Sequence, residues 1–344
     1  MSLLQTLLAV LTTLGSLIVA LPLITLVASC MALVFLTRVI RRIIEPRYSP
    51  WSELLEFDPT FGWKPKAFLH THYLADDVFY ATTDAQGWRG NTSLSDSDIV
   101  VFGDSFAWGY GVDDRNHFAS VAIPLRIKAI GTMGYNMVQA FQWMEHLSSY
   151  LHGKSVVWFI YYGNDLYENL VPHMRHYRMP FMRKTNGTRG WEIVTSHLSP
   201  QAWSFTSEHR DIGEKYYEKL AELCSETFLS QRAYAACAFL IGQAKVLCEE
   251  VGAQLSVVGI PDIVQFSAQG VTRLQALVPE SQCVDPNYPD KQIRQICDGL
   301  DVPFVSLKDH LNICDHKKYD VHWNEKGHRK VAGVLMQMYY DYIP

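Results

Sequence analysis

The sequence predicts an open, doubly wound α/β fold, and two observations carry that prediction. Apolar runs rich in Val and Ile recur along the chain, as is typical of buried parallel strands. These five runs are 98–103, 126–131, 155–163, 254–261 and 302–307. Helix-like stretches at 136–151, 231–251 and 325–342 alternate with them. The alternation favours a parallel sheet of about five strands with helices on both faces.

The composition narrows the class of partner. The chain has 344 residues, of which 48% are hydrophobic, and a formal net charge of -5 without basic runs in its body. A nucleic-acid binder normally carries a basic patch, so that class is excluded. The expected partners are small molecules, glycans or lipids.

The N-terminal segment has the length and polarity of a membrane span. From Leu3 to Leu36 no side chain carries a formal charge, whereas a bilayer span needs about 20 apolar residues. One tilted span competes with a hairpin of two short spans, and we favour one because each half of a hairpin would be at the lower limit of length. We therefore expect a transmembrane segment at 1–42, a linker at 43–56 and a single catalytic domain at 57–344.

The orientation of this segment is open on the sequence alone. Arginines follow the span, which by the positive-inside rule would keep the domain in the cytoplasm. They are Arg38, Arg41, Arg42 and Arg47. Against that, the six cysteines of the soluble part form an even number compatible with disulfides, although free thiols fit equally well. These cysteines are Cys224, Cys237, Cys248, Cys283, Cys297 and Cys314, and no pair has the CxxC spacing of a zinc site. Asn91 and Asn186 fit the glycosylation pattern.

An insertion at about 166–230 interrupts the alternation after the third strand. We expect it to be part loop and part helix, and to shape the substrate pocket as a lid. It carries a basic cluster, for which a solvated face and contact with an anionic substrate both remain open. The cluster consists of His173, Arg175, His176 and Arg178.

The stretch "VVFGDSFAWGYG" places Ser105 directly after the first strand. A serine on a tight turn at a strand's carboxyl end projects its hydroxyl into the cleft of such a sheet. The alternative is that Ser105 only caps the helix that follows. Trp108 and Tyr110 are candidates for a sugar or acyl platform, with burial in the core as the alternative.

A serine nucleophile needs a base, and the base needs a group that orients it. Near the C-terminus, "YDVHWNEKGH" provides both types in Asp320 and His322. In an extended or looped backbone, residues two apart can face the same way, so Asp320 can hold one imidazole nitrogen while the other meets Ser105. A solvated loop or a helix cap is the alternative for this pair.

Acyl transfer also needs hydrogen-bond donors for an oxyanion. The second strand run is followed by "GTMGYNMVQ", where Gly134 offers a backbone amide, and the third by "YYGND", where Asn164 offers a side-chain amide. Asp104 and Asp165 flank these positions, and we expect them to orient backbone amides rather than to react.

The ordered set "GDSFAWG", "GYNMVQ", "GND" and "DVHWNEKGH" resembles the four conserved blocks of the SGNH/GDSL hydrolases. These are serine esterases on a flavodoxin-like, three-layer α/β/α sandwich, and the resemblance covers roughly Phe57 to Tyr342. It implies that Ser105 attacks and also lends its backbone amide, and that Gly134 and Asn164 complete the oxyanion hole. It further implies that Asp320 and His322 complete the triad.

The chain departs from the family pattern at two places. The common last block has Asp three residues before His, where this chain has Tyr319, and many relatives carry Asn where it has Ala129. The tighter Asp-x-His-Trp spacing is similar to that of relatives that O-acetylate exported polysaccharides. The lead-in "FDPTFGWKPK" and the N-terminal span resemble membrane-anchored bacterial members, whose catalytic domains are usually extracytoplasmic.

The sequence therefore predicts a membrane-anchored SGNH-type serine esterase of the bacterial inner membrane, acting on a short acyl or acetyl ester through an acyl-enzyme on Ser105. We expect no metal and no cofactor. Two alternatives stay open. One is an O-acyltransferase acting on an exported glycan. The other is a non-catalytic scaffold subunit of a membrane complex, which would then be its partner.

Overall fold

The computed structural model describes residues 27–33, 36, 51–74, 78–90, 92–174, 177–185, 190–196, 198 and 214–342. The chain divides into two compact units, Met1–Arg47 and Tyr48–Pro344. In the first unit, residues 27–33 and 36 are helical. Among the residues with a described placement, no helix is both long and apolar enough to cross a bilayer. Most of the expected membrane segment at 1–42 lies outside those residues, so it stays a prediction.

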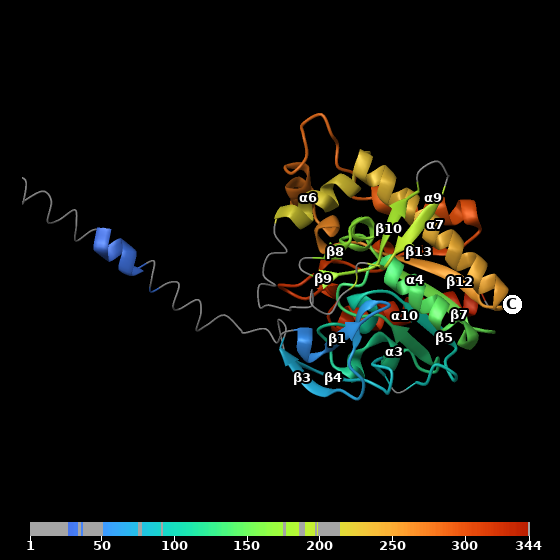
Figure 1. Cartoon of the computed structure of the whole chain (residues 1–344). Coiled ribbons are helices and arrows are strands. Elements are labelled where there is room, and N and C mark those ends of the chain that lie inside the picture. The colour runs from blue at the N-terminus through green and yellow to red at the C-terminus, as the bar shows by residue number, and fades with distance from the viewer. Residues whose placement is uncertain are drawn as a thin grey trace, which may run out of the picture. The chain divides into compact units, whose positions relative to one another are not determined.

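The second unit is built on a five-stranded parallel sheet (Figure 1). Its strands are β5 (Ile99–Phe102), β6 (Ile127–Ile130), β7 (Ser155–Tyr161), β12 (Gln254–Ile260) and β13 (Phe304–Ser306). They are arranged in the order β13-β12-β7-β5-β6, and every neighbouring pair is parallel. In order of appearance this is 2-1-3-4-5 read from the other edge, the flavodoxin-like order. The prediction of the α/β sandwich and of its five strands is confirmed.

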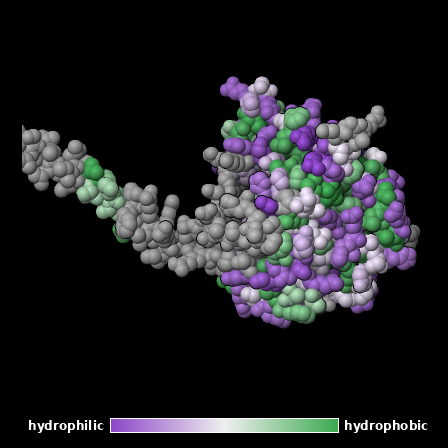
Figure 2. Space-filling model, viewed as in Figure 1, coloured by the Kyte–Doolittle hydropathy of each residue, from purple (hydrophilic) through white to green (hydrophobic). Residues whose placement is uncertain are grey.

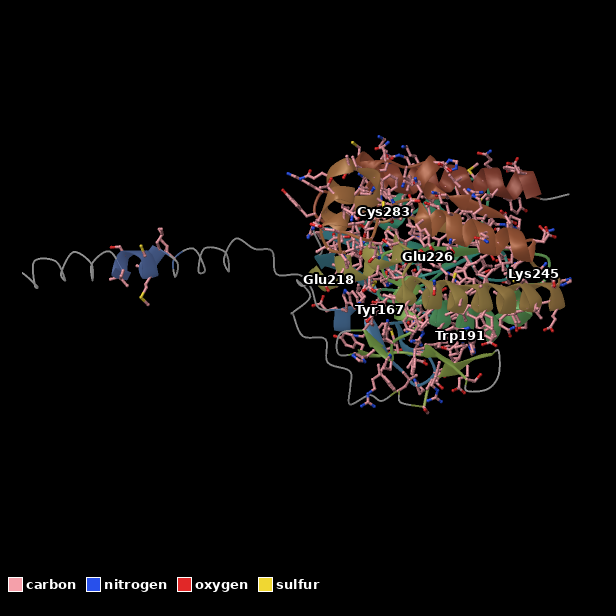
Figure 3. The ribbon with its side chains drawn as sticks, turned by 90° about the horizontal axis from the view of Figure 1, so that it is seen from above. Tyr167, Trp191, Glu218, Glu226, Lys245 and Cys283 are labelled. Atoms are coloured by element: carbon pink, nitrogen blue, oxygen red, sulfur yellow. The ribbon has the colours of Figure 1, made fainter. Side chains whose placement is uncertain are left out.

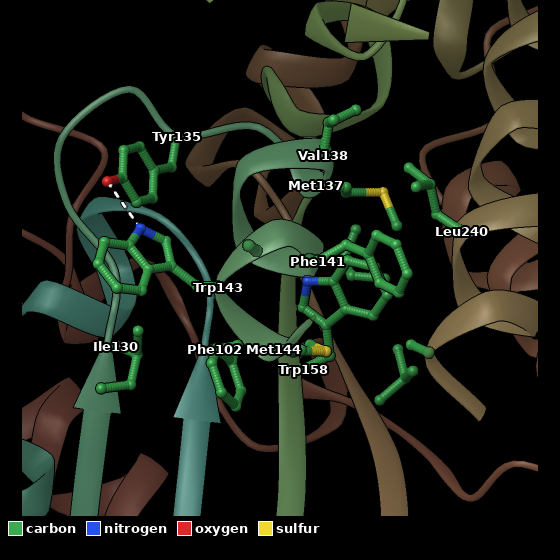
Figure 4. Packing of buried hydrophobic residues seen from close by; sticks show 14 of the residues in the cluster. Phe102, Ile130, Tyr135, Met137, Val138, Phe141, Trp143, Met144, Trp158 and Leu240 are labelled. Carbon is green, nitrogen blue, oxygen red and sulfur yellow. Dashed lines mark hydrogen bonds between the residues drawn. The ribbon is translucent and has the colours of Figure 1, made fainter. Parts of the chain in front are cut away.

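Alternate residues of each strand face opposite sides of the sheet, which builds two separate cores. Val100 and Phe102 of β5 lie in one core with α4 and α7, whereas Ile99 and Val101 lie in the other with α3 and α10. In Figure 4, side chains of α4 such as Phe141 pack between the sheet and α7. Because both faces are covered, the polar groups at the carboxyl ends of the strands are left to form a cleft.

Helices cover both faces and one edge of the sheet. They are α2 (Ser105–Trp108), α3 (Phe118–Val121), α4 (Met137–His146), α5 (Asp165–Glu168), α6 (Glu214–Leu223), α7 (Phe228–Glu250), α8 (Ala268–Gln275), α9 (Tyr288–Leu300) and α10 (Glu325–Tyr342). The helices expected at 136–151, 231–251 and 325–342 correspond to α4, α7 and α10. A short 3₁₀ turn, Ser148–Tyr150, replaces the last turn expected for α4.

Four small hairpins lie outside the sheet. They are formed by β1 (Leu55–Asp58) with β2 (Gly62–Pro65), β3 (His70–Leu74) with β4 (Val78–Thr82), β8 (His173–Met174) with β9 (Tyr177–Arg178), and β10 (Phe181–Lys184) with β11 (Trp191–Val194). The last two hairpins and α6 lie in the described part of the insertion, which also contains most of α5 and the start of α7. Leu54 and Leu55 are buried, so the domain's core begins inside the stretch expected as a linker.

All seven cysteines are described, and all are free. Cys224, Cys237, Cys248 and Cys297 are buried, whereas Cys283 and Cys314 are exposed. Of the two interpretations of the even number, free thiols are therefore the correct one. The cysteines give no support for an oxidising compartment.

On the face of the second unit drawn in Figure 2, hydrophilic and hydrophobic residues are interspersed. Single exposed apolar side chains such as Phe68, Ile123 and Phe228 are ordinary features of a protein surface. That face therefore gives no sign of a large apolar docking surface.

Candidate active site

The turn after β5 places Ser105 at the start of a helix without making it the cap. Asp104 is the N-cap of α2, and its Oδ1 accepts the backbone N–H of Phe106 at 2.9 Å. Ser105 is the first helical residue and is 8% exposed. Gly109 then ends the helix in the left-handed conformation, which a glycine adopts without strain. The alternative of Ser105 as a helix cap is therefore wrong.

Ser105, His322 and Asp320 form one hydrogen-bonded chain. Ser105 Oγ lies 2.6 Å from His322 Nε2, and His322 Nδ1 is hydrogen-bonded to Asp320 Oδ1. The same carboxylate oxygen accepts the backbone N–H of His322 at 2.9 Å. Since Nδ1–H donates to Asp320, Nε2 carries the lone pair that faces the serine hydroxyl.

The loop that carries the imidazole is fixed on both sides. His316 and Trp323 form an antiparallel bridge across it, and Lys317 N–H donates to His322 C=O at 2.9 Å. Asn324 caps α10 by accepting the N–H of Lys326 at 2.9 Å. The Asp-x-His pair therefore lies in a constrained turn rather than in a solvated loop.

The electrostatic surroundings raise the pKa of His322. Burial by itself lowers the pKa of His322, but the Asp320 carboxylate and, more weakly, Asp104 outweigh it, so the pKa of His322 lies above its ordinary value. Burial by itself raises the pKa of Asp320, yet His322 beside it lowers the net pKa of that carboxyl. Such a pair stabilises the imidazolium that a general base forms.

The carboxyl ends of β6, β5 and β7 lie side by side because these strands are neighbours in the sheet. Gly134, four residues after β6, has φ +71° and lies against Met174 of β8 and Trp51; a Cβ there would be 2.5 Å from Met174 Cε. Asn164 is the N-cap residue of α5, and its Nδ2 donates to Glu168 Oε2 at 2.8 Å. Gly134 and Asn164 thus follow the two strands that flank the Ser105 strand.

Two buried carboxyl groups, Asp104 and Asp165, adjoin Ser105 and Asn164 in the sequence. Asp165 Oδ2 accepts the backbone N–H of Tyr161 at 2.9 Å, as Asp104 accepts that of Phe106. The prediction that both residues orient backbone amides is confirmed. Burial raises the pKa of Asp104 and of Asp165, and the Asp104 charge adds to the rise at Asp165.

The two aromatic candidates for a substrate platform, Trp108 and Tyr110, differ in their placement. Trp108 is buried in the core, so the platform interpretation is wrong for it. Tyr110 is half-buried, and its ring lies 4.9 Å from that of His322. Tyr110 therefore forms part of the wall of the site, as does Phe106, whose ring is 4.7 Å from the imidazole.

The basic cluster of the insertion is described only in part. His173 and Arg178 are exposed and face each other across the β8–β9 hairpin. Arg175 and His176 lie outside the described residues, as do Asn91 and Asn186.

Ala129 of β6 is buried in an apolar core. Its side chain therefore cannot make the hydrogen bond that an Asn at this position would make.

Arg89 is a supporting residue that sequence reasoning missed. It is 1% exposed and pairs with Asp114, and its guanidinium donates to the carbonyls of Gly109 at 2.6 Å and Val112 at 2.8 Å. It thereby holds the turn that carries Tyr110. An isolated Arg in "QGWRGN" gives no local signal for this role.

A second missed group is a buried carboxylate at the end of β12. Asp262 accepts hydrogen bonds from Tyr161 and Tyr216. Its position after "SVVGIP" at a strand's carboxyl end was the available signal.

Within the described ranges, no three His, Cys, Asp or Glu side chains are grouped in a way that would hold a metal ion.

No family model and no curated protein matches the chain. Several solved structures are similar to it at low identity. The inhibitor-bound aryl esterase of M. smegmatis is 9% identical with a TM-score of 0.41, covering 72% of this chain and 100% of that one. A carbohydrate acetylesterase from Sinorhizobium meliloti is 11% identical with a TM-score of 0.40, covering 72% and 100%. A GDSL-like lipase from Bacteroides thetaiotaomicron is 11% identical with a TM-score of 0.38, covering 71% and 88%.

Proposed function

We propose that this chain is an SGNH-type serine ester hydrolase that acts on a short acyl ester. The observation that supports the proposal is the chain of contacts from Ser105 Oγ to His322 Nε2 and from His322 Nδ1 to Asp320. A serine hydroxyl, an imidazole and a carboxylate in this order are the parts that acyl transfer to water requires.

In the first half of the reaction, Ser105 Oγ attacks the ester carbonyl carbon while its proton passes to His322 Nε2. Collapse of the tetrahedral intermediate breaks the bond to the alcohol oxygen, and His322 returns the proton to that oxygen. In the second half, water attacks the acyl-serine while its proton passes to His322. Collapse of the second intermediate breaks the bond to Ser105 Oγ, His322 returns the proton to that oxygen, and the carboxylic acid leaves. Asp320 stabilises the imidazolium in both halves.

The developing oxyanion needs donors that are in place before it forms. The backbone N–H of Ser105, the backbone N–H of Gly134 and the side-chain amide of Asn164 are the three donors that we assign to it. Their placement after three neighbouring strands supports the assignment. Loss of one such donor costs about 10² to 10³ in kcat.

The test uses p-nitrophenyl acetate and a fluorophosphonate probe on the purified chain. The wild type is expected to hydrolyse the ester and to be labelled, and Ser105→Ala is expected to lose both. Ser256→Ala, which changes a half-buried serine of β12 away from the site, is the matched control and keeps both. A wild type that neither hydrolyses short acyl esters nor is labelled would contradict the proposal and favour the scaffold alternative.

The same assay separates hydrolysis from transfer to a glycan. With an oligosaccharide acceptor present, a hydrolase releases all of the acetyl group as acetate. Acetyl groups recovered on the sugar would identify the chain as an O-acyltransferase.

We propose in addition that the segment 3–36 anchors the chain in a membrane and that the catalytic domain lies on the extracytoplasmic side. The uncharged length of the segment supports the anchor, and the resemblance to anchored bacterial relatives supports the side. The exposed Cys283 and Cys314 allow a test. A membrane-impermeant maleimide is expected to label both in intact spheroplasts, and the double Ser variant is the control. Labelling that requires lysis would overturn the placement.

A further inference from the structure

Three hydroxyl and carboxylate groups meet in a buried triangle at the carboxyl ends of β7 and β12. Asp262 Oδ2 accepts the Tyr161 hydroxyl at 2.5 Å and the Tyr216 hydroxyl at 2.6 Å. The two hydroxyl oxygens lie 2.7 Å apart. Asp262 and Tyr161 are buried and Tyr216 is half-buried, so the Tyr161–Asp262 hydrogen bond is shielded from competing water and those of Tyr216 are shielded in part. The Tyr161–Asp262–Tyr216 triangle joins α6 of the insertion to the sheet.

The triangle lies directly against the backbone that precedes Asn164. A Cβ on Gly163 would overlap the Tyr216 hydroxyl and would come within 2.5 Å of the Tyr161 ring. The Tyr216 hydroxyl thus occupies the space that a side chain at position 163 would fill. Any shift of that hydroxyl changes the space available to the peptide between Gly163 and Asn164.

Hydrogen bonds to β7 and within α5 hold the backbone and the side chain around Asn164. Tyr161 N–H donates to Asp165 Oδ2 at 2.9 Å, and Asn164 C=O accepts the N–H of Glu168 at 2.9 Å. The Asn164 amide donates to Glu168 Oε2 at 2.8 Å. One of its two N–H groups is then engaged by the helix, which leaves the other available for the oxyanion.

We propose that Tyr216, held by Asp262, is a positioning residue that sets the Asn164 amide at the distance and angle the oxyanion requires. This inference rests on the proposed function. Its physical basis is that a displacement of about 1 Å in a reacting or stabilising group can cost about 10² in rate. Helix α6 of the insertion would then contribute to catalysis through the oxyanion donor.

Removal of the hydroxyl is expected to leave α6 in place, because other contacts also hold this helix. Leu220 and Ala221 of α6 are buried in a cluster with Leu274 of α8. On the other side, Lys219 of α6 lies over the ring of Tyr167 of α5 at 5.8 Å. Figure 3 labels Tyr167 and Glu218 and shows the two helices as neighbours. Tyr216→Phe is therefore a local change.

The experiment compares Tyr216→Phe with a matched control, Tyr234→Phe. The Tyr234 hydroxyl is also buried and also holds α6, since it donates to Leu223 C=O at 2.8 Å, but it does not reach Gly163. With p-nitrophenyl acetate, Tyr216→Phe is expected to lower kcat by about tenfold at unchanged KM, the pattern for an interaction made only in the transition state. Tyr234→Phe is expected to lower the melting temperature by a similar amount and to keep kcat.

A double variant tests whether Tyr216 acts through Asn164. Asn164→Ala is expected to lower kcat by about 10², and adding Tyr216→Phe is expected to lower it no further, because residues that act as one unit are not additive. Independent, multiplied effects would overturn the inference, as would an unchanged kcat in Tyr216→Phe. Full activity in Ser105→Ala would instead refute the proposed function itself, so the two failures are distinguishable.

Discussion

Asp320 holds His322 through two hydrogen bonds to one carboxylate oxygen, Oδ1. One comes from the backbone N–H of His322 at 2.9 Å, and the other comes from its Nδ1. Because the backbone and the ring are both tied to one oxygen, a spacing of two residues is enough to orient the imidazole. Tyr319, at the three-residue position, is 77% exposed and takes no part in this arrangement.

The first prediction concerns the acidic limb of the pH–rate profile. The neutral form of His322 is the base, and its pKa lies above 6.5 because the opposing carboxylates outweigh burial. kcat/KM therefore rises with pH through a value above 6.5. Asp320→Asn removes the main charge, so the limb is expected to move to lower pH while the maximum falls about 10³ to 10⁴-fold.

The control for this profile is Glu325→Gln, which removes an exposed carboxylate three residues beyond His322. Its limb is expected to coincide with that of the wild type. An Asp320→Asn profile with an unchanged limb would show that another group titrates.

The second prediction separates two costs of replacing Gly134. Gly134 and Gly153 have φ +71° and +70°, but a Cβ on Gly134 meets Met174 whereas one on Gly153 meets nothing within 4 Å. Gly153→Ala is expected to cost about 1 kcal/mol of unfolding free energy from strain alone and to keep kcat. Gly134→Ala is expected to cost up to about 1 kcal/mol more, because the atoms that a Cβ would meet, Sδ and Cε, end the flexible Met174 side chain, and to lower kcat. Urea denaturation and p-nitrophenyl acetate turnover measure both; equal effects at the two positions would contradict the prediction.

The third prediction concerns the ion pair between the buried Arg89 and the half-buried Asp114. Arg89→Met removes the donor to Asp114 Oδ1 and to the carbonyls of the 108–112 turn, although Thr82 still donates to Asp114 Oδ2, and is expected to cost about 3 to 5 kcal/mol in unfolding free energy. The exposed Arg126–Asp98 pair is the comparison, and Arg126→Met is expected to change stability little. Denaturation of the two variants gives the answer, and similar midpoints would refute it.

The fourth prediction is a loss of stability in acid from two buried histidines. Burial lowers the pKa of His117 to about 3 and holds that of His328 well below 6.5. Below pH 6.5 the unfolded chain binds protons that the folded chain does not, so each histidine lowers the unfolding free energy by about 1.4 kcal/mol per pH unit. This contribution is fully present above pH 6.5 and is lost as the pH falls.

His328→Asn tests the point without removing the contact. The Asn carbonyl oxygen replaces the His328 Nδ1 that accepts Phe118 N–H at 3.2 Å. The variant is expected to show a shallower dependence of unfolding free energy on pH, by about one proton. Parallel curves for wild type and variant would count against the assignment.

The parts that the sequence could predict are those with a local pattern. The runs "DIVVF" and "SVVWFIYY" give the buried strands β5 and β7, because strands covered on both faces need apolar side chains at successive positions. The hairpins β1–β2 and β3–β4 were not predicted. Their strands have four or five residues with mixed polarity, too short for a periodic signal.

The pattern of apolar and polar residues is enough to predict the class of fold and the order of Ser105, Gly134 and Asn164 along the chain. A parallel sheet brings the carboxyl ends of its strands to one edge, so residue types at strand ends indicate the chemistry of the cleft. The contact of Ser105 with His322, which lies 217 residues away, and that of Tyr216 with Asp262 beside Gly163 follow only from the packed fold. Hydrogen bonds between distant segments depend on how helices and loops pack, so the spacing of residues along the chain does not predict them.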